Sequence, residues 1–290
     1  QFSQRDRKIM ASIEEFMEKR RSEGLLRSLK PVSSRHNGKI YFDKKEYIDF
    51  SSNDYLGLSG HPRMIKAAKS VMDDFGTASC ASRLLSGDLD IHHQLEEAVA
   101  QFKGKEAALV FNTGYQANIG IISALYGRKD CIFSDRFNHA SIVDGALLSG
   151  AHFFRFQHNN IEHLETLLQN ERDKFDKAVI ITETVFSMDG DTPDLKGLLR
   201  LKNKYNCWIM VDEAHATGIF GENGSELVEQ EGLKKEIDLV MGTFSKALGS
   251  FGAYLATSRK IVEYLINVSR GFIYSTALPP SVIACNLEAI

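Results

Sequence analysis

The sequence has 290 residues, of which 43% are hydrophobic and 25% are charged. This composition is close to the average for globular proteins, and it excludes a mainly disordered, collagen-like or proline-rich chain. The formal net charge of −3 disfavours nucleic-acid binding, because proteins that bind nucleic acids usually carry a basic excess.

The four cysteines lie far apart, without a C-x-x-C pair or a zinc-binding spacing. We therefore expect reduced thiols, no metal site and a cytoplasmic protein. No apolar run approaches the roughly 20 residues that a membrane span requires. The polar start of the sequence also lacks the apolar core of a secretion signal.

The first 45 residues are predicted to form an N-terminal helix and a connector, ahead of one large domain over residues 46–290. Apolar residues recur at helical spacing over residues 9–21, and the rest of that stretch is charged. Two short apolar runs, at residues 40–42 and 47–50, predict a hairpin across a charged turn.

Apolar runs and helical patterns alternate through the large domain. The expected strands cover residues 107–111, 131–135, 152–156, 178–184, 208–212, 239–242 and 252–257. Expected helices between them cover residues 92–102, 116–125, 161–168 and 195–204. This alternation predicts an α/β fold with a mostly parallel, doubly wound sheet and helices on both faces. Ligands of such folds bind outside the carboxyl ends of the strands.

The first of these strand ends is followed by a phosphate-site candidate. Asn112-Thr113-Gly114-Tyr115 opens a helix, where free N–H groups attract a phosphate. Tyr115 could stack on a flat ring. An ordinary strand-to-helix turn is the alternative.

Two later strand ends also carry polar residues. His139 stands just before a helix and could equally be a capping or core histidine. Asp189, Asp191 and Asp194 invite a calcium hypothesis, but Pro193 occupies the place of a third acidic ligand of an EF-hand loop. A turn with solvated acids is the better interpretation.

The sharpest signals come from the last two strand ends. Four apolar residues precede Asp212, and a buried carboxylate there needs a cationic or N–H partner. His215 can reach the same ligand. Lys246 follows Thr243 among small and apolar residues, where desolvation would lower its pKa and make it a nucleophile and base. A surface lysine in a glycine-rich loop is the alternative.

Together these groups meet the needs of pyridoxal 5′-phosphate. The lysine would bind the aldehyde covalently, the aspartate would pair with the ring nitrogen, and the helix start would bind the phosphate. A flavodoxin-like nucleotide binder would account for the fold but not for Lys246, Asp212 and His215 together, and no Walker A pattern is present.

The sequence resembles the α-oxoamine synthases, a branch of the fold-type-I pyridoxal-phosphate enzymes, from about Gly24 onward. The matching segments are residues 50–58, 138–141, 186–191, 211–215, 242–249 and 274–280. The resemblance implies the fold-type-I architecture. The chain stops at Ile290 inside an apolar helical segment, so the family's C-terminal domain is expected to be missing, and with it an arginine that holds the substrate carboxylate.

The resemblance also implies a role for each site residue. Lys246 would hold the cofactor and remove the α-proton, Asp212 would keep the ring nitrogen protonated, and His215 would hydrogen-bond the phenolic oxygen. His139 would stack on the ring and Ser187 would lie near the ring oxygen. The phosphate would be bound by Gly114, Tyr115 and Thr243, with Ser275 or Thr276 supplied to the site of a partner subunit in a homodimer. Arg27 and Asn53 would lie near the substrate.

The implied reaction is the decarboxylative condensation of an amino acid with an acyl thioester. L-alanine and a pimeloyl group, carried by coenzyme A or a carrier protein, are preferred, which places the reaction in biotin synthesis. The alternatives are glycine C-acetyltransferase or another α-oxoamine synthase and, in a different class, a catalytically silent binding subunit. Lys246 argues against the silent subunit.

Overall fold

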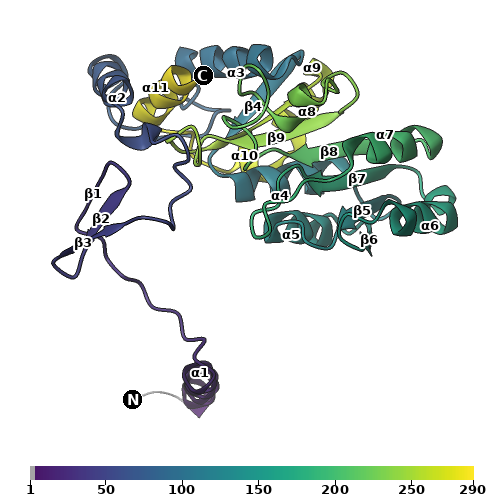
Figure 1. Cartoon of the computed structure of the whole chain (residues 1–290), viewed down its shortest axis with the longest axis horizontal. Coiled ribbons are helices and arrows are strands. Elements are labelled where there is room, and N and C mark those ends of the chain that lie inside the picture. The colour runs from purple at the N-terminus through teal and green to yellow at the C-terminus, as the bar shows by residue number, and fades with distance from the viewer. Residues whose placement is uncertain (1–3) are drawn as a thin grey trace. The chain divides into compact units, whose positions relative to one another are not determined.

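The computed structural model describes residues 4–290 and divides the chain into two compact units, one up to Ser51 and one from Ser52 to Ile290 (Figure 1). The first unit holds helix α1 (Gln4–Ser22) and an antiparallel sheet of β1 (Ser34–His36), β2 (Lys39–Phe42) and β3 (Lys45–Ile48). Strands β2 and β3 are the predicted hairpin. Asp43 and Lys44 connect them with φ of 47° and 60°, as a tight two-residue hairpin turn requires. Strand β1 was not predicted, because its three exposed residues carry no apolar alternation.

The second unit is built on a seven-stranded sheet in the order β4-β10-β9-β8-β7-β5-β6. Only β10 is antiparallel to its neighbours, so the mostly parallel sheet is confirmed. The strands are β4 (Ala107–Phe111), β5 (Cys131–Asp135), β6 (His152–Phe156), β7 (Ala178–Glu183), β8 (Trp208–Asp212), β9 (Leu239–Thr243) and β10 (Ala253–Thr257).

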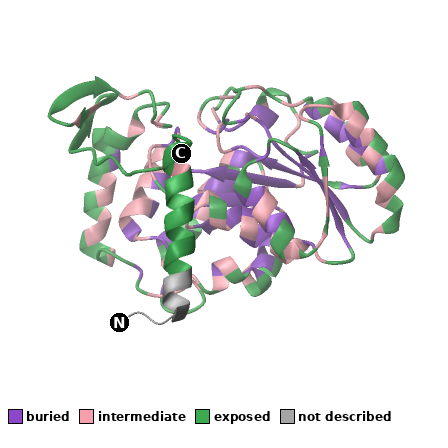
Figure 2. Ribbon diagram, turned by 90° about the horizontal axis from the view of Figure 1, so that it is seen from below, coloured by how far each residue is buried: buried purple, intermediate pink, exposed green. Residues whose placement is uncertain are grey.

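Helices cover both faces of this sheet, as the doubly wound prediction requires, and the strands between them are buried (Figure 2). One apolar core packs against α3 (Asp90–Lys103), α6 (Ile161–Glu171), α7 (Leu195–Lys204), α8 (Leu227–Gln230) and α11 (Pro280–Ala289). The other packs against α4 (Gly114–Leu125), α5 (Ala140–Ser149), α9 (Arg259–Val268) and α10 (Arg270–Ile273). Within β4, Ala108 and Val110 enter the first core and Leu109 and Phe111 the second, because successive strand side chains point to opposite faces.

The remaining helix, α2 (Pro62–Phe75), packs against α11. No helix in the described part of the chain is long and apolar enough to span a bilayer. Since β4, β5, β7, β8 and β9 share one direction, their carboxyl ends meet at one edge of the sheet. The predicted site residues follow these ends.

Candidate active site

Lys246 and His215 are in direct contact at this edge. Lys246 lies in the turn after β9, and its Nζ is 2.6 Å from Nε2 of His215, in the turn after β8. Burial lowers the pKa of Lys246, while the negative charges of Asp212 and Glu183 act against that shift. Burial and the charge of Lys246 lower the pKa of His215 to about 4, so the ring is neutral at pH 7 and Nε2 can accept from the amine.

The second ring nitrogen of His215, Nδ1, makes a further hydrogen bond. Nδ1 lies 2.7 Å from the hydroxyl of Tyr55, and that hydroxyl donates to Oδ1 of Asn53 over 3.1 Å. With Nε2 accepting from Lys246, the ring proton sits on Nδ1 and is donated to Tyr55. Asn53, a predicted substrate residue, is thus linked to Lys246 through two side chains.

Asp212 ends β8 with only 4% of its surface exposed. Its carboxylate accepts hydrogen bonds from Nδ2 of Asn118 and from the backbone N–H of Ala214, each 2.9 Å long. Both donors are neutral N–H groups, so neither is a cation that would compete with a protonated ring nitrogen for this carboxylate. These two N–H groups are partners of the kind that the sequence predicts for a buried carboxylate at a strand end.

His139 caps α5, which was one of its two alternative interpretations. Its Nδ1 accepts from the backbone N–H of Ser141 over 3.2 Å, and the ring itself is exposed and edge-on to Tyr115. The backbone N–H of His139 donates to Glu183 over 2.6 Å. The exposed imidazole is therefore held at its base and free to stack on a ligand ring.

The start of α4 offers the predicted phosphate site. Thr113 is the N-cap, with its hydroxyl accepting from the N–H of Gln116 over 3.0 Å, and Gly114 and Tyr115 form the first turn. Ser275 accepts from Gln116 Nε2 over 2.7 Å, and the carbonyl of Thr276 accepts from Asn112 over 2.8 Å. The predicted phosphate ligands of two distant segments therefore meet beside one helix N-terminus.

The other predicted residues are placed as follows. Thr243 ends β9, and its hydroxyl donates to the carbonyl of Gly252 over 2.7 Å and contacts the hydroxyl of Ser245. Ser187 lies in the exposed turn after β7. Arg27 belongs to the first unit, where it is exposed. The roles assigned to these residues stay predictions.

These groups fit pyridoxal phosphate. A half-buried lysine with a lowered pKa, a charged strand-end carboxylate, a neutral histidine and an open helix N-terminus supply the bonds that its aldehyde, ring nitrogen, phenolic oxygen and phosphate need. A Cβ built at Gly114 would lie 3.7 Å from Met241, an ordinary contact, so packing within the protein does not itself require glycine there.

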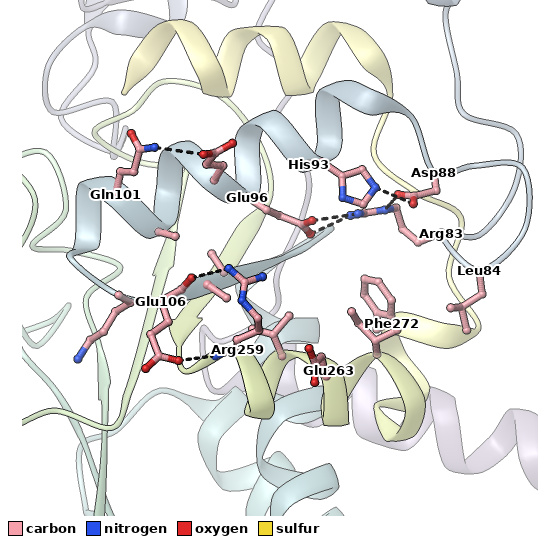
Figure 3. Close-up of a pocket in the computed structure, with 17 residues that line it drawn as sticks. Arg83, Leu84, Asp88, His93, Glu96, Gln101, Glu106, Arg259, Glu263 and Phe272 are labelled. Carbon is pink, nitrogen blue, oxygen red and sulfur yellow. Dashed lines mark hydrogen bonds and ion pairs between the residues drawn. The ribbon is translucent and has the colours of Figure 1, made fainter.

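A hollow of about 600 Å³ lies elsewhere, over β4 and between α3 and α9 (Figure 3). Its buried cation, Arg83, is already paired with Glu96 over 2.9 Å and with Asp88. At its opposite wall the backbone N–H of Arg259 donates to the carboxylate of Glu106, and the Arg259 guanidinium donates to the backbone carbonyl of the same residue. The lining also carries the carboxylates of Glu97 and Glu263, so the hollow has no excess of positive charge for an anionic ligand, and it contains none of the predicted cofactor residues.

Tyr55, Asn118 and Glu183 complete the site but were not predicted. Tyr55 stands within one of the resembling segments, and Glu183 is the next-to-last residue of an expected strand, but neither position alone shows which atoms its side chain contacts. Asn118 lies one turn into α4, where nothing in the sequence distinguishes it from a solvent-facing polar residue.

Comparison with known proteins places the chain in a family. The sequence profile described as aminotransferase class I and II matches residues 45–287. The 8-amino-7-oxononanoate synthase of Geotalea daltonii is 49% identical over 280 residues, which cover 97% of this chain and 71% of the relative. The enzyme of the same name from Geobacter sulfurreducens is 51% identical over 270 residues, covering 93% and 69%.

Solved structures agree with these relatives. A serine palmitoyltransferase from S. paucimobilis with a bound PLP–myriocin aldimine superposes with a TM-score of 0.90 at 32% identity, covering 96% of this chain and 70% of the other. An 8-amino-7-oxononanoate synthase from Francisella tularensis gives a TM-score of 0.70 at 34% identity, covering 83% and 67%. The chain therefore belongs to the aminotransferase class I and II family and, within it, to the pyridoxal-phosphate-dependent α-oxoamine synthases.

Proposed function

We propose that this protein condenses L-alanine with a pimeloyl thioester, with loss of carbon dioxide, to give 8-amino-7-oxononanoate in the cytoplasm. The observation that carries the proposal is the high identity to several synthases of this name along almost the whole chain. The gathering of Lys246, Asp212 and His215 at one sheet edge supports it, because these are the groups that the chemistry needs.

Bound pyridoxal phosphate would supply a sink for the electron pair left on the amino acid's α-carbon. Asp212 would hold a positive charge on the ring nitrogen, which strengthens that sink. The N-terminus of α4, with Gly114, Tyr115 and Thr243, would bind the phosphate, and His139 would cover the ring face.

Lys246 is suited to move the α-proton. Its lowered pKa leaves a larger neutral fraction of the amine near pH 7 than an exposed lysine has, and only the neutral amine can accept a proton. His215, itself neutral, can accept a hydrogen bond from that amine and pass the alignment on to Tyr55.

A product assay tests the function. Purified protein is supplied with pyridoxal phosphate, L-alanine and pimeloyl thioester, and the amino ketone is detected by mass spectrometry. Lys246→Ala should lower the rate by roughly a thousandfold or more, whereas exposed Lys129→Ala should leave it unchanged. Faster turnover of glycine with acetyl-CoA, or of L-serine with palmitoyl-CoA, would assign the chain to a sister activity instead.

We also propose a homodimer with shared sites, in which Ser275 or Thr276 reaches the phosphate bound by the partner subunit. Within one chain both residues lie beside the start of α4, so the same side chains could serve their own site. Mixing Lys246→Ala chains with chains in which Ser275 and Thr276 are both alanine distinguishes the two. Shared sites predict that the mixture regains activity, since one site of each mixed dimer escapes both changes.

A further inference from the structure

His158, just past the end of β6, lies between two carboxylates that have no role in the proposed function. Its Nδ1 is 3.0 Å from Oδ1 of Asp135, and its Nε2 is 2.8 Å from Oδ2 of Asp191. Phe137 stacks on the ring with centroids 4.3 Å apart, and Phe186 meets it edge-on at 4.5 Å. The imidazole is therefore enclosed by two apolar rings and two anions.

Only a protonated ring satisfies both contacts. A neutral imidazole has one N–H and would turn a lone pair toward the other carboxylate, whereas the imidazolium donates from both nitrogens. Burial acts to lower the pKa of His158, but the hydrogen bonds and charges of Asp135 and Asp191 outweigh it and raise the pKa above its ordinary value. These two carboxylates are the charged groups that the described neighbouring elements bring to the ring.

The two carboxylates belong to different segments. Asp135 ends β5 and is fixed by the backbone N–H groups of Phe137 and Asn159, at 2.8 and 2.9 Å. Asp191 lies beyond β7 and accepts from the side chain of Asn159 over 2.8 Å. The side chain of Asp135 is 1% exposed and that of Asp191 is 42% exposed. The contact of His158 with Asp191 is thus weaker than its contact with Asp135.

Each segment carries a predicted site residue. The turn that begins at Asp135 ends at His139, the expected ring-stacking residue. The backbone N–H of Phe186 donates to the carbonyl of Asp191 over 3.1 Å and closes the loop that contains Ser187. Loss of the contact between His158 and Asp191 would therefore let His139 and Ser187 shift relative to each other.

We propose that His158, held between Asp135 and Asp191, is a positioning residue that fixes the turn bearing His139 against the loop bearing Ser187. The proposal rests on the proposed function in one respect, that His139 and Ser187 contact the cofactor. We call His158 with Asp135 and Asp191 the clamp. The consequence of the proposal is that the affinity for pyridoxal phosphate falls as the pH rises and His158 loses its second proton. The acids of the 189–194 segment are then not all solvated, as the sequence interpretation had them, since Asp191 is a clamp residue.

Nitrogen NMR of the imidazole groups tests the clamp on cofactor-free protein, with His158→Gln to assign the His158 signal. At neutral pH the ring should carry protons on both nitrogens. Asp191→Asn should lower its pKa and shift the signals of His139. Asp189→Asn makes the same charge change at an exposed neighbour and should do neither. A His158 ring with one proton at neutral pH, or equal effects of the two variants, would overturn the proposal.

Titration with pyridoxal phosphate, followed by absorbance, then tests the consequence. Between about pH 6 and about pH 8.5, wild type and Asp189→Asn should lose roughly threefold more affinity than Asp191→Asn does. Identical pH dependence in all three proteins would overturn the positioning role even if the ring titrates as expected. A wild-type protein that binds no pyridoxal phosphate would refute the proposed function, while the His139 signals would still decide the clamp.

Discussion

Glu183 and Asp212 are direct partners across the parallel pair β7 and β8, so two carboxyl groups end side by side at the site. They are 3% and 4% exposed. Burial, and then the negative charge of Asp212, raises the pKa of Glu183 to about 8. Burial beside Asp212 therefore favours the protonated form of Glu183 over a second buried negative charge at the site.

Glu183→Gln should flatten the pH dependence of stability. The folded pKa of Glu183 lies above its unfolded value of about 4.5, so the folded chain binds more protons between these values. The stabilisation is complete below the unfolded pKa and is lost as pH rises through about 8, with a slope of at most about 1.4 kcal/mol per pH unit. Urea unfolding at several pH values should show a smaller decline in the variant than in wild type. Glu222→Gln, at an exposed position, should keep the wild-type decline.

Much of the fold could be predicted because most strands of the large sheet are buried on both faces. Such strands are nearly continuous apolar runs, and β4, β5 and β8 were predicted to the residue. The bounds of the edge strand β6 were also predicted, although only Phe156 of it is buried. The direction of β10 could not be predicted, because an apolar run of five residues looks the same read either way. Helix α2 was not predicted, and only one of its residues, Met64, is buried.

The site was predictable where chemistry coincides with a strand end. Asp212, Thr243 and Lys246 were found in this way. Tyr55 and Glu183 were not, because their contacts depend on pairings that bring distant segments together, such as the 160 residues between Tyr55 and His215. A sequence motif shows which residues are present but not which of their atoms meet.

Tyr55→Phe should slow turnover with little loss of stability. The change removes the hydroxyl that accepts from His215 and donates to Asn53, so the imidazole that faces Lys246 loses its support. Tyr55 is 44% exposed, and its hydroxyl bonds contribute little to folding. We expect kcat to fall by about tenfold, as for loss of one aligned hydrogen bond. Tyr264→Phe is the matched control, since Tyr264 is 48% exposed and its hydroxyl donates to Ala124 away from the site. Equal kcat values for the two variants would remove Tyr55 from the catalytic chain.

Gly249→Ala should displace the turn that carries Lys246. Gly249 has φ of 61°, and a Cβ there would run into the backbone of Leu58 and Ser59, within 2.6 Å of the Leu58 carbonyl carbon. Gly224→Ala is the matched control, because its φ is 68° but its nearest atom is 3.8 Å away. Both changes carry the strain of a left-handed alanine, about 1–2 kcal/mol, but only Gly249→Ala adds a backbone collision. It should lower the melting temperature further and reduce covalent trapping of pyridoxal phosphate by borohydride. Equal trapping in both variants would show that the turn tolerates the shift.

Behind the site lies a buried charge cluster on which the turn after β8 depends. Lys103 Nζ is 3.1 Å from the carboxylate of Glu226 and 3.1 Å from the hydroxyl of Thr217, and it also contacts the carbonyl of Ser225. Glu213, next to Asp212, accepts from the backbone N–H groups at the start of α8. Burial opposes the charge on Lys103, yet its polar neighbours raise its pKa to about 12. The cluster thus keeps one full positive charge inside the core.

Lys103→Met should be strongly destabilising, because it leaves the carboxylates of Glu226 and Glu213 without their cation. Breaking a buried pair on one side costs about 3–5 kcal/mol. Adding Glu226→Gln should restore part of the lost stability, since the amide carries no charge that would be left without a partner. The double variant should therefore be more stable than the sum of the two single changes predicts.

Lys105→Met is the control, because the Lys105 amine donates to the backbone carbonyls of Lys234 and Ile237 and its loss leaves no carboxylate without an ion-pair partner. Urea unfolding at one pH, applied to wild type, the two single variants, the double variant and Lys105→Met, gives the five free energies of unfolding. Additive costs in the double variant, or an equal cost for Lys105→Met, would mean that Lys103 acts through packing rather than through its charge.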